Sequence, residues 1–185
     1  MKLKTFGTPL LCIALIVQSG CAIHEAAARG TDSGVQVGFS PDAGAETLVL
    51  DVIASARHTI RLGGYLFTSR PIVHALIAAR RRDVDVRIVL DDRGNRDAAS
   101  RSAIRQVVGA GIPTRVISAY PIHHDKYIIV DGRSIETGSF NYTHAAAHAN
   151  SENVLVVWNN PQVAAQYLAH WESRWAQGID VETAR

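Results

Sequence analysis

A histidine and a lysine two residues apart could place a nucleophile beside a positive charge. His124 and Lys126 open a segment that continues Tyr-Ile-Ile-Val and reaches Asp131. The Tyr-Ile-Ile-Val run predicts a β-strand, and side chains alternate between the two faces of a strand. We therefore expect the imidazole of His124 and the ammonium group of Lys126 on one side, with His123 and Asp125 on the other. A nucleophile next to a positive charge, as His124 and Lys126 would form, is suited to a reaction on an anionic substrate.

A second group of polar residues follows a few positions later. Gly138 and Ser139 are followed, after one phenylalanine, by Asn141. An extended backbone would put the hydroxyl and the carboxamide on one face, and the glycine permits close approach of another chain segment. An imidazole, an ammonium group, a hydroxyl and an amide together supply a nucleophile, charge neutralisation and donors to non-bridging oxygens. The combination predicts a site that cleaves a phosphate diester.

The whole pattern resembles the signature of the phospholipase D superfamily. It reads His124-x-Lys126-x4-Asp131-x6-Gly138-Ser139-x-Asn141, and every fixed position of the signature is filled. More loosely, the resemblance extends over the predicted catalytic domain, residues 35–185. It implies an α/β fold, a mixed β-sheet flanked by helices with one motif per chain. It also implies a phosphodiesterase that needs no cofactor.

The same resemblance assigns roles to individual residues. His124 would attack phosphorus and form a covalent phosphohistidine intermediate. Lys126 and Asn141 would bind the phosphate oxygens, with Ser139 close by. Asp131 would support them by orienting a neighbour or balancing charge.

Other ionisable residues are weaker candidates. Glu152 would be a second carboxylate, able to hold an imidazole in its productive tautomer. No metal is implied, because Lys126 and the amide donors neutralise the charge that a cation would otherwise handle. Asp91 and the residue after it follow a predicted strand and are interpreted as a solvent-exposed strand end rather than a metal site. Tyr65 is considered for the mouth of the cleft, although no motif supports it. The spacing of the remaining histidines matches no zinc signature; they are His58, His74, His144, His148 and His170.

The single copy of the motif has a consequence for assembly. Many members of the family carry two copies, whose histidines act as the nucleophile and as the general acid for the leaving group. With one copy, the chain would complete its site by pairing across a two-fold axis, so we expect a homodimer with the active site at the interface. Single-motif members that resemble this chain are typically small bacterial endonucleases.

The substrate remains open between two classes. A non-specific nuclease acting on DNA and RNA is the first interpretation, because nothing resembles a base-reading helix or a zinc finger. A phospholipase D that hydrolyses phosphatidyl head groups is the alternative. The net charge of +2 does not by itself indicate a nucleic-acid-binding protein. A non-catalytic phosphate-binding or adhesion module is disfavoured, because binding alone needs no nucleophile.

The N-terminus has the features of an export signal. Residues 1–28 contain two early lysines, the apolar run Pro9–Val17 and a stretch of small residues, and the run is shorter than a membrane span of about 20 residues. Gly20-Cys21 resembles a lipoprotein cleavage site, although Gln18 departs from that pattern. Cleavage within Ala26–Ala28 is the alternative. We expect a periplasmic or secreted protein, with a lipid anchor on Cys21 as one form of attachment.

The rest of the chain alternates between strand and helix patterns, which favours an α/β layered domain. Residues 29–34 are interpreted as a tether. The predicted strands are Val35–Phe39, Thr59–Phe67, Val84–Leu90, Pro113–Ser118, Lys126–Val130 and Asn153–Trp158, and the predicted helices are Pro41–Arg57, Pro71–Arg82, Asp97–Gly109 and Pro161–Gly178.

Overall fold

A computed structural model describes Met1 and residues 34–181 of the 185-residue chain. The predicted export signal, apart from Met1, and residues 29–33 of the tether lie outside the described residues. Within the described part, no helix is long and apolar enough to cross a membrane.

Eight strands form one mixed sheet, in the order β1-β7-β6-β5-β2-β3-β4-β8. β2, β3 and β4 run parallel to one another, and every other neighbouring pair is antiparallel. The strands are β1 (Val35–Ser40), β2 (Thr59–Gly64), β3 (Asp85–Asp91), β4 (Thr114–Ile117), β5 (Lys126–Val130), β6 (Ser134–Gly138), β7 (Glu152–Val157) and β8 (Ile179–Asp180).

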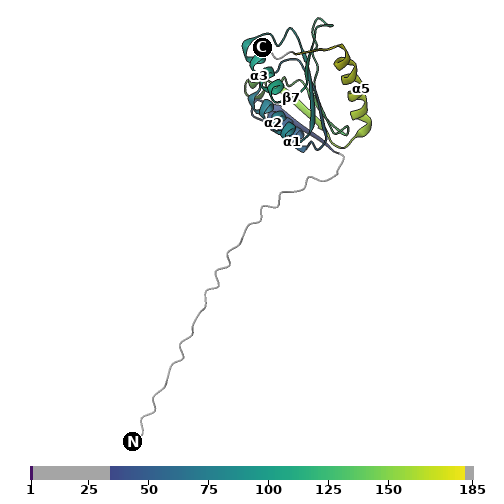
Figure 1. Ribbon diagram of the computed structural model, residues 1–185. Helices are drawn as coiled ribbons and strands as arrows, with labels where there is room; N and C mark the ends of the chain where they lie inside the picture. The colour runs from purple at the N-terminus through teal and green to yellow at the C-terminus, as the bar shows by residue number, and fades with distance from the viewer. Residues whose placement is uncertain (2–33, 182–185) are drawn as a thin grey trace. The chain divides into compact units, whose positions relative to one another are not determined.

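Helices cover both faces of this sheet (Figure 1). Parallel neighbours need crossover connections, and α2 and α3 supply them on the face that α1 also covers. α5 packs on the opposite face, over β2, β4, β5 and β6. The helices are α1 (Ala45–Ser55), α2 (Arg70–Arg81), α3 (Ala98–Gly109), the short α4 (His144–His148) and α5 (Pro161–Gln177).

The strand β5 shows how the two cores are separated. Ile128 and Val130 point into the larger core under α1, α2 and α3. Tyr127 and Ile129 point into the smaller core under α5. Because both faces of the sheet are covered, all five residues of the strand are buried. The alternation also decides which face each side chain at the end of the strand can reach.

Local signals in the sequence explain where the helices begin. The Ser69 side chain accepts a hydrogen bond from the backbone of Ile72 and caps α2, with a proline in the first turn. Asp97 caps α3 through the backbone amides of residues 99 and 100, and Asn160 caps α5. These side chains satisfy backbone N–H groups that have no partner inside the helix.

The structure confirms the predicted α/β fold and changes several boundaries. α1 begins at Ala45, because Gly44 at φ 92° interrupts the helix predicted from Pro41. β2 ends at Gly64, since the amide of Phe67 turns to the side chain of Asn95, 3.0 Å away. Three short elements, β6, α4 and β8, were not predicted, because their sequences lack a clear period.

Candidate active site

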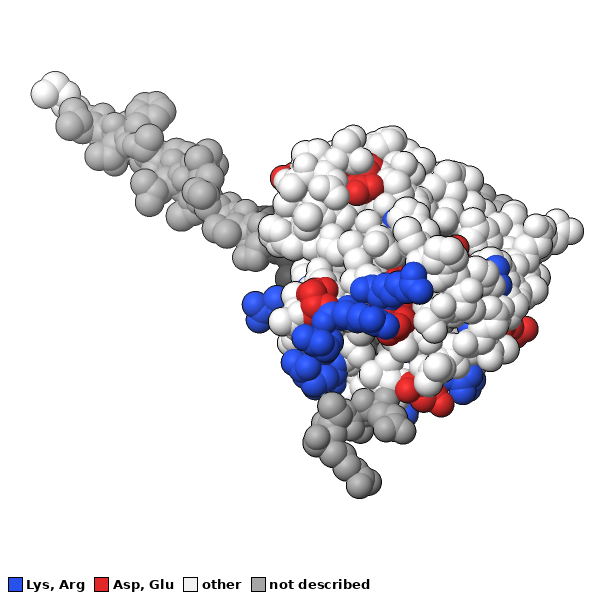
Figure 2. All heavy atoms as spheres, turned by 90° about the horizontal axis from the view of Figure 1, so that it is seen from above, with Lys and Arg blue, Asp and Glu red and all other residues white. Residues whose placement is uncertain are grey.

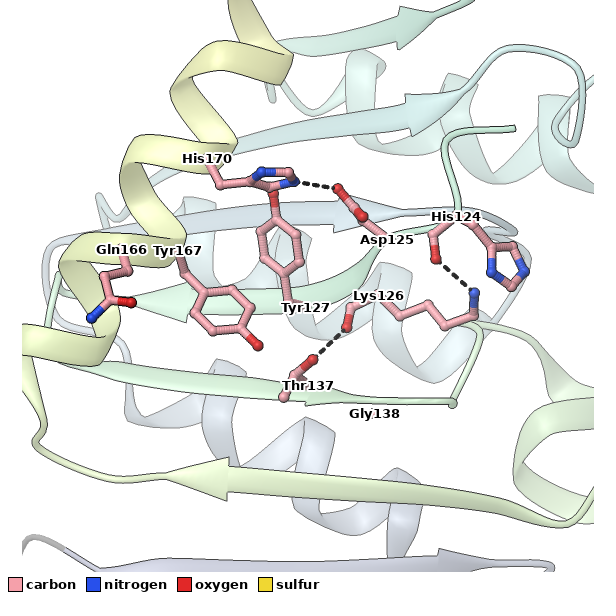
Figure 3. A pocket seen from close by; sticks show the side chains of 9 residues that line it. All are labelled: His124, Asp125, Lys126, Tyr127, Thr137, Gly138, Gln166, Tyr167 and His170. Carbon is pink, nitrogen blue, oxygen red and sulfur yellow. Dashed lines mark hydrogen bonds and ion pairs between the residues drawn. The ribbon is translucent and has the colours of Figure 1, made fainter. Parts of the chain in front are cut away.

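A pocket of about 450 Å³ opens where β5 begins and β6 ends, beside α5 (Figure 3). Its floor comes from the two strands and the residues just before β5, and one wall comes from α5. The lining residues are His124, Asp125, Lys126, Tyr127, Thr137, Gly138, Gln166, Tyr167 and His170. Two of the predicted site residues, His124 and Lys126, therefore line one cavity.

His124 precedes β5 and is fixed by its neighbours rather than by the strand. Its ring lies 4.8 Å from the ring of Tyr65, centroid to centroid. Nζ of Lys126 donates a hydrogen bond to the backbone oxygen of His124 at 3.0 Å and lies 5.4 Å from the Tyr65 ring centre. The aromatic ring thus contacts both the proposed nucleophile and the cation, and cation–π attraction favours this position of the ammonium group.

Lys126 is a buried cation, with 7% of the residue exposed. Burial lowers the pKa of its ammonium group, while the charges of Glu152 and Asp125 act in the opposite direction. A partly desolvated ammonium group interacts more strongly with an incoming anion than one in water does. Lys126 therefore gives the pocket a cationic group suited to an anionic ligand.

Ser139 and Glu152 form a hydrogen-bonded unit next to this cation. The Ser139 hydroxyl donates to Oε2 of Glu152 at 2.6 Å and accepts from the backbone N–H of Asn153 at 3.1 Å. Asn150 donates to the other carboxylate oxygen at 3.0 Å. The carboxylate is thus oriented by two side chains and adds negative charge near Lys126.

Gly138 allows this arrangement. A Cβ atom at this position would overlap the carbonyl oxygen of Asn153, to which the Ser139 amide donates at 3.1 Å. Only a residue without a side chain lets β6 and β7 approach closely enough to bring Ser139 to Glu152.

Asn141 lies on the loop after β6. Its side-chain oxygen is buried and has no hydrogen-bond partner among the described residues. The next residue, Tyr142, donates its backbone N–H to the oxygen of Leu66 at 3.1 Å, which ties the loop to the segment that carries Tyr65. This oxygen can only accept a hydrogen bond, so a contact between Asn141 and a phosphate oxygen would have to come from its amide N–H group.

Asp131 lies away from the pocket that His124 and Lys126 line. It follows β5 at the end opposite His124, and its carboxylate accepts hydrogen bonds from the backbone amides of Arg57, His58 and Thr59 at 2.9, 2.7 and 2.8 Å. The sequence assigned it a supporting role in catalysis. In the structure its carboxylate instead fixes the turn between α1 and β2.

The environment of Asp91 also differs from the expected solvent-exposed strand end. Asp91 is 2% exposed and accepts hydrogen bonds from the backbone amides of Gly94 and His123, at 2.6 and 2.7 Å. The His123 ring is buried too, and burial lowers its pKa despite the nearby charges of Asp125 and Asp91. These groups shape the turn that leads into His124.

Sequence reasoning missed the contribution of α5. His170 lies 2.8 Å from Asp125, nitrogen to oxygen, and Tyr167 packs edge-on against Tyr127 at 5.2 Å. No sequence motif marks the pocket-lining residues of this helix. Within residues 34–181, no group of three or more His, Cys, Asp or Glu residues could hold a metal ion.

Comparisons with known proteins agree with this geometry. The family model described as "Cardiolipin synthase, PLD-like domain" matches residues 49–175. A phospholipase D of Rickettsia bellii is 35% identical over 145 residues, which cover 78% of this chain and 71% of that protein. A mitochondrial cardiolipin hydrolase of Xenopus laevis is 30% identical over 68% of this chain and 58% of that protein.

The solved structures include a relative of higher identity. Nuc from Salmonella typhimurium, described as a phospholipase D family member, is 51% identical, with a TM-score of 0.80 over 81% of this chain and 99% of Nuc. NucT from Helicobacter pylori shares the fold, with a TM-score of 0.68 at 18% identity. With this family match and the cluster of His124, Lys126, Ser139 and Glu152, the chain belongs to the phospholipase D superfamily of phosphodiesterases.

Proposed function

We propose that this phosphodiesterase is a non-specific endonuclease that cleaves DNA and RNA without a metal ion. The observation that carries the proposal is the shared pocket of His124 and Lys126, in a chain that matches 99% of Nuc at 51% identity. A small single-motif chain of this kind resembles the bacterial endonucleases of the family.

The proposed reaction proceeds in two steps. In the first, a ring nitrogen of His124 attacks phosphorus, the bond to the leaving oxygen breaks, and that oxygen takes a proton from a general acid. In the second, water attacks the phosphohistidine, gives up its proton to the same group, and releases a phosphate monoester and free His124. Lys126 and Asn141 stabilise the charge on the non-bridging oxygens in both steps.

We assign the general acid to His124 of the partner subunit in a homodimer. The described chain carries one copy of the motif and therefore one histidine of this kind. A second such histidine must come from a second copy of the chain. Exposed apolar residues provide a surface for pairing: Val35, Val37 and Phe39 of the edge strand β1 are 62%, 59% and 52% exposed.

This apolar surface, Val35, Val37 and Phe39, lies on the same sheet face as the pocket. In the register of β1, β7 and β6, Val37 aligns with Leu155 and then with Thr137, which lines the pocket. Among the described residues, α5 packs mainly over β2, β4, β5 and β6, and the three apolar side chains of β1 stay exposed. A second copy seated there would bring its own pocket close to this one.

The dimer is tested with Phe39→Asp, measured by analytical ultracentrifugation and by diesterase activity. We expect a monomer with little activity, whereas Ile179→Asp, on the exposed residue of the opposite edge strand β8, should remain an active dimer. Adding excess His124→Ala protein should also suppress the wild type through mixed dimers. A fully active monomer would rule the arrangement out.

The substrate is tested with plasmid DNA and phosphatidylcholine vesicles, each with a chelator and with His124→Ala as the inactive control. We expect nicking of DNA that persists in chelator and disappears in His124→Ala. Loss of DNA cleavage in chelator would contradict the metal-free mechanism.

A phospholipase D is the second candidate function. The Rickettsia relatives named phospholipase D favour it. Ile122, 54% exposed and two residues before His124, would give an apolar contact for a lipid near the pocket. Turnover of phosphatidylcholine without DNA cleavage would establish this function in place of the nuclease.

We also propose that residues 1–28 direct export, as their sequence indicates. Mass spectrometry of the mature protein from fractionated cells tests this, with Cys21→Ser as a control for lipidation. Export is contradicted by a full-length protein that stays inside the cell.

A further inference from the structure

Glu136 is a carboxyl group that the proposed mechanism does not use and that the fold buries completely. It lies in the middle of β6, between Ile128 of β5 and Val156 of β7. Both neighbours belong to the core under α1, α2 and α3, and Glu136 itself is 0% exposed. An acid in such a position is costly unless it is bound by a partner.

Its partner is Tyr142, a second fully buried side chain. The Tyr142 hydroxyl donates to Oε2 of Glu136 at 3.0 Å. The other carboxyl oxygen, Oε1, is buried and has no hydrogen-bond partner among the described residues. The Glu136 carboxyl thus has a single described contact through its oxygens, and that contact holds the tyrosine.

Tyr142 in turn joins two segments of the chain. Its backbone N–H donates to the oxygen of Leu66 at 3.1 Å. Its backbone oxygen accepts hydrogen bonds from the amides of Thr68 and Ser69, both at 2.8 Å. A shift of Tyr142 therefore moves the loop after β6 and the segment after β2 together.

Both segments carry residues of the site. Asn141 immediately precedes Tyr142, and Tyr65, whose ring contacts His124, immediately precedes Leu66. We infer that Glu136 is a positioning residue: through Tyr142 it holds Asn141 and Tyr65 in the geometry that the phosphodiesterase reaction needs.

Ionisation of Glu136 offers a distinctive signal. Burial raises its pKa to about 8, while the hydrogen bond from Tyr142 acts in the opposite direction. The pKa of Tyr142 is raised well above its ordinary value by burial and by the charges of Glu136, Tyr127 and Asp125, so it stays a donor. With a pKa of about 8, the Glu136 carboxyl is mostly protonated at neutral pH and ionises around pH 8.

The effect on stability has a definite sign. Between the ordinary pKa of 4.5 and about 8, the unfolded chain has lost this proton while the folded chain keeps it. Stability therefore falls as pH rises through this window and levels off above it. Glu136→Gln removes this titratable group. The Tm of the variant, measured relative to the Tm of the wild type, should therefore rise as pH increases.

The test compares Glu136→Gln, Glu136→Leu and Tyr142→Phe for kcat and KM on bis(p-nitrophenyl) phosphate over a range of pH. The glutamine oxygen still accepts from Tyr142, so we expect kcat within about twofold of wild type at neutral pH. The other two variants leave a buried polar group without a partner and should lose about tenfold in kcat, with a small change in KM. Rescue of kcat by Glu136→Gln but not by Glu136→Leu, both measured well below Tm, identifies the hydrogen bond as the feature that matters.

Val86→Ala is the control for simple loss of stability. Val86 is a fully buried residue of β3 in the same core, and it contacts neither partner of the pair through a hydrogen bond. It should lower Tm while kcat is retained.

Two results would overturn the inference. One is a loss of kcat in Val86→Ala that matches Glu136→Leu. The other is a loss of kcat in Glu136→Gln as large as that in Glu136→Leu, because the glutamine oxygen keeps the acceptor for Tyr142. The diester probe is neither a nucleic acid nor a lipid, so the comparison stands whichever natural substrate is correct.

Discussion

At the scale of single residues, the main feature of the site is a buried, partly desolvated cation next to a histidine. Lys126 is buried, its ammonium group is tied to the backbone of His124, and Tyr65 covers both. Carboxylates at Asp125 and Glu152 oppose the pKa shift that burial causes. These carboxylates favour the charged form of the ammonium group, whose attraction to a phosphate is little screened by water at this buried position.

Tyr65 should contribute to catalysis through its ring. Tyr65→Leu removes the contacts with His124 and Lys126, and we expect kcat/KM to fall about fivefold, equivalent to about 1 kcal/mol of cation–π and ring contact. Tyr65→Phe keeps the ring and should stay close to wild type. Steady-state kinetics on a diester measure both; equal losses in the two variants would instead point to the hydroxyl.

At the scale of elements, the two ends of β5 have different tasks. One end presents Lys126 to the pocket, and the other leads to Asp131, which binds three backbone amides at the start of β2. The motif therefore spans a whole strand. Its first residues line the pocket, and Asp131 at the other end stabilises the fold.

Asp131→Ala tests this division. Three amides lose a charged acceptor, so the free energy of unfolding should fall by about 2 kcal/mol. At temperatures well below the transition, kcat should remain unchanged. Denaturant titration and steady-state kinetics give the two values. A large loss of kcat without loss of stability would return Asp131 to the catalytic role that the sequence suggested.

The contact between β6 and β7 depends on Gly138. In Gly138→Ala the added Cβ overlaps the carbonyl of Asn153, and we expect a loss of about 3 kcal/mol in stability and of most activity, because Ser139 is displaced from Glu152. Gly109→Ala is the matched control. No atom lies within 4 Å of its Cβ position at the end of α3, so thermal unfolding should show equal or higher stability.

At the scale of the whole molecule, charge is unevenly arranged although the net charge is only +2. Figure 2 shows Lys and Arg side chains gathered on one part of the face seen from above, with acidic residues among them. Near the pocket, Arg93 is exposed on the loop after β3, and the next residue, Gly94, packs against the Tyr65 ring.

If nucleic acid is the substrate, Arg93 should contact a phosphate outside the scissile bond. Arg93→Gln should raise KM for DNA and reduce the salt dependence of log KM by a slope of about 1, the effect of one lost phosphate contact. Arg57→Gln, exposed at the opposite end of β5, is the control and should match wild type. Salt titrations of DNA cleavage measure the slope, and equal slopes in all three proteins would contradict this role.

The sequence by itself determined the family, the fold class and the central pair of the site. His124, Lys126 and Asn141 were predicted from a local pattern, because a motif places its residues within a few positions of each other. The helices capped by Ser69 and Asp97 were also predictable, since a cap and an apolar period act over one or two turns.

Only the tertiary structure decided which groups meet across the chain. Tyr65 reaches His124 and α5 forms a pocket wall through contacts between distant positions, for which a single sequence carries no signal. Asp131, inside the motif, turned toward backbone amides more than 70 positions away. Glu136 belongs to no sequence motif and lies in a strand that was not predicted, and packing against the sheet left it buried against Tyr142. Burial and pairing of this kind are properties of the folded sheet, because they depend on neighbouring strands and not on neighbouring residues.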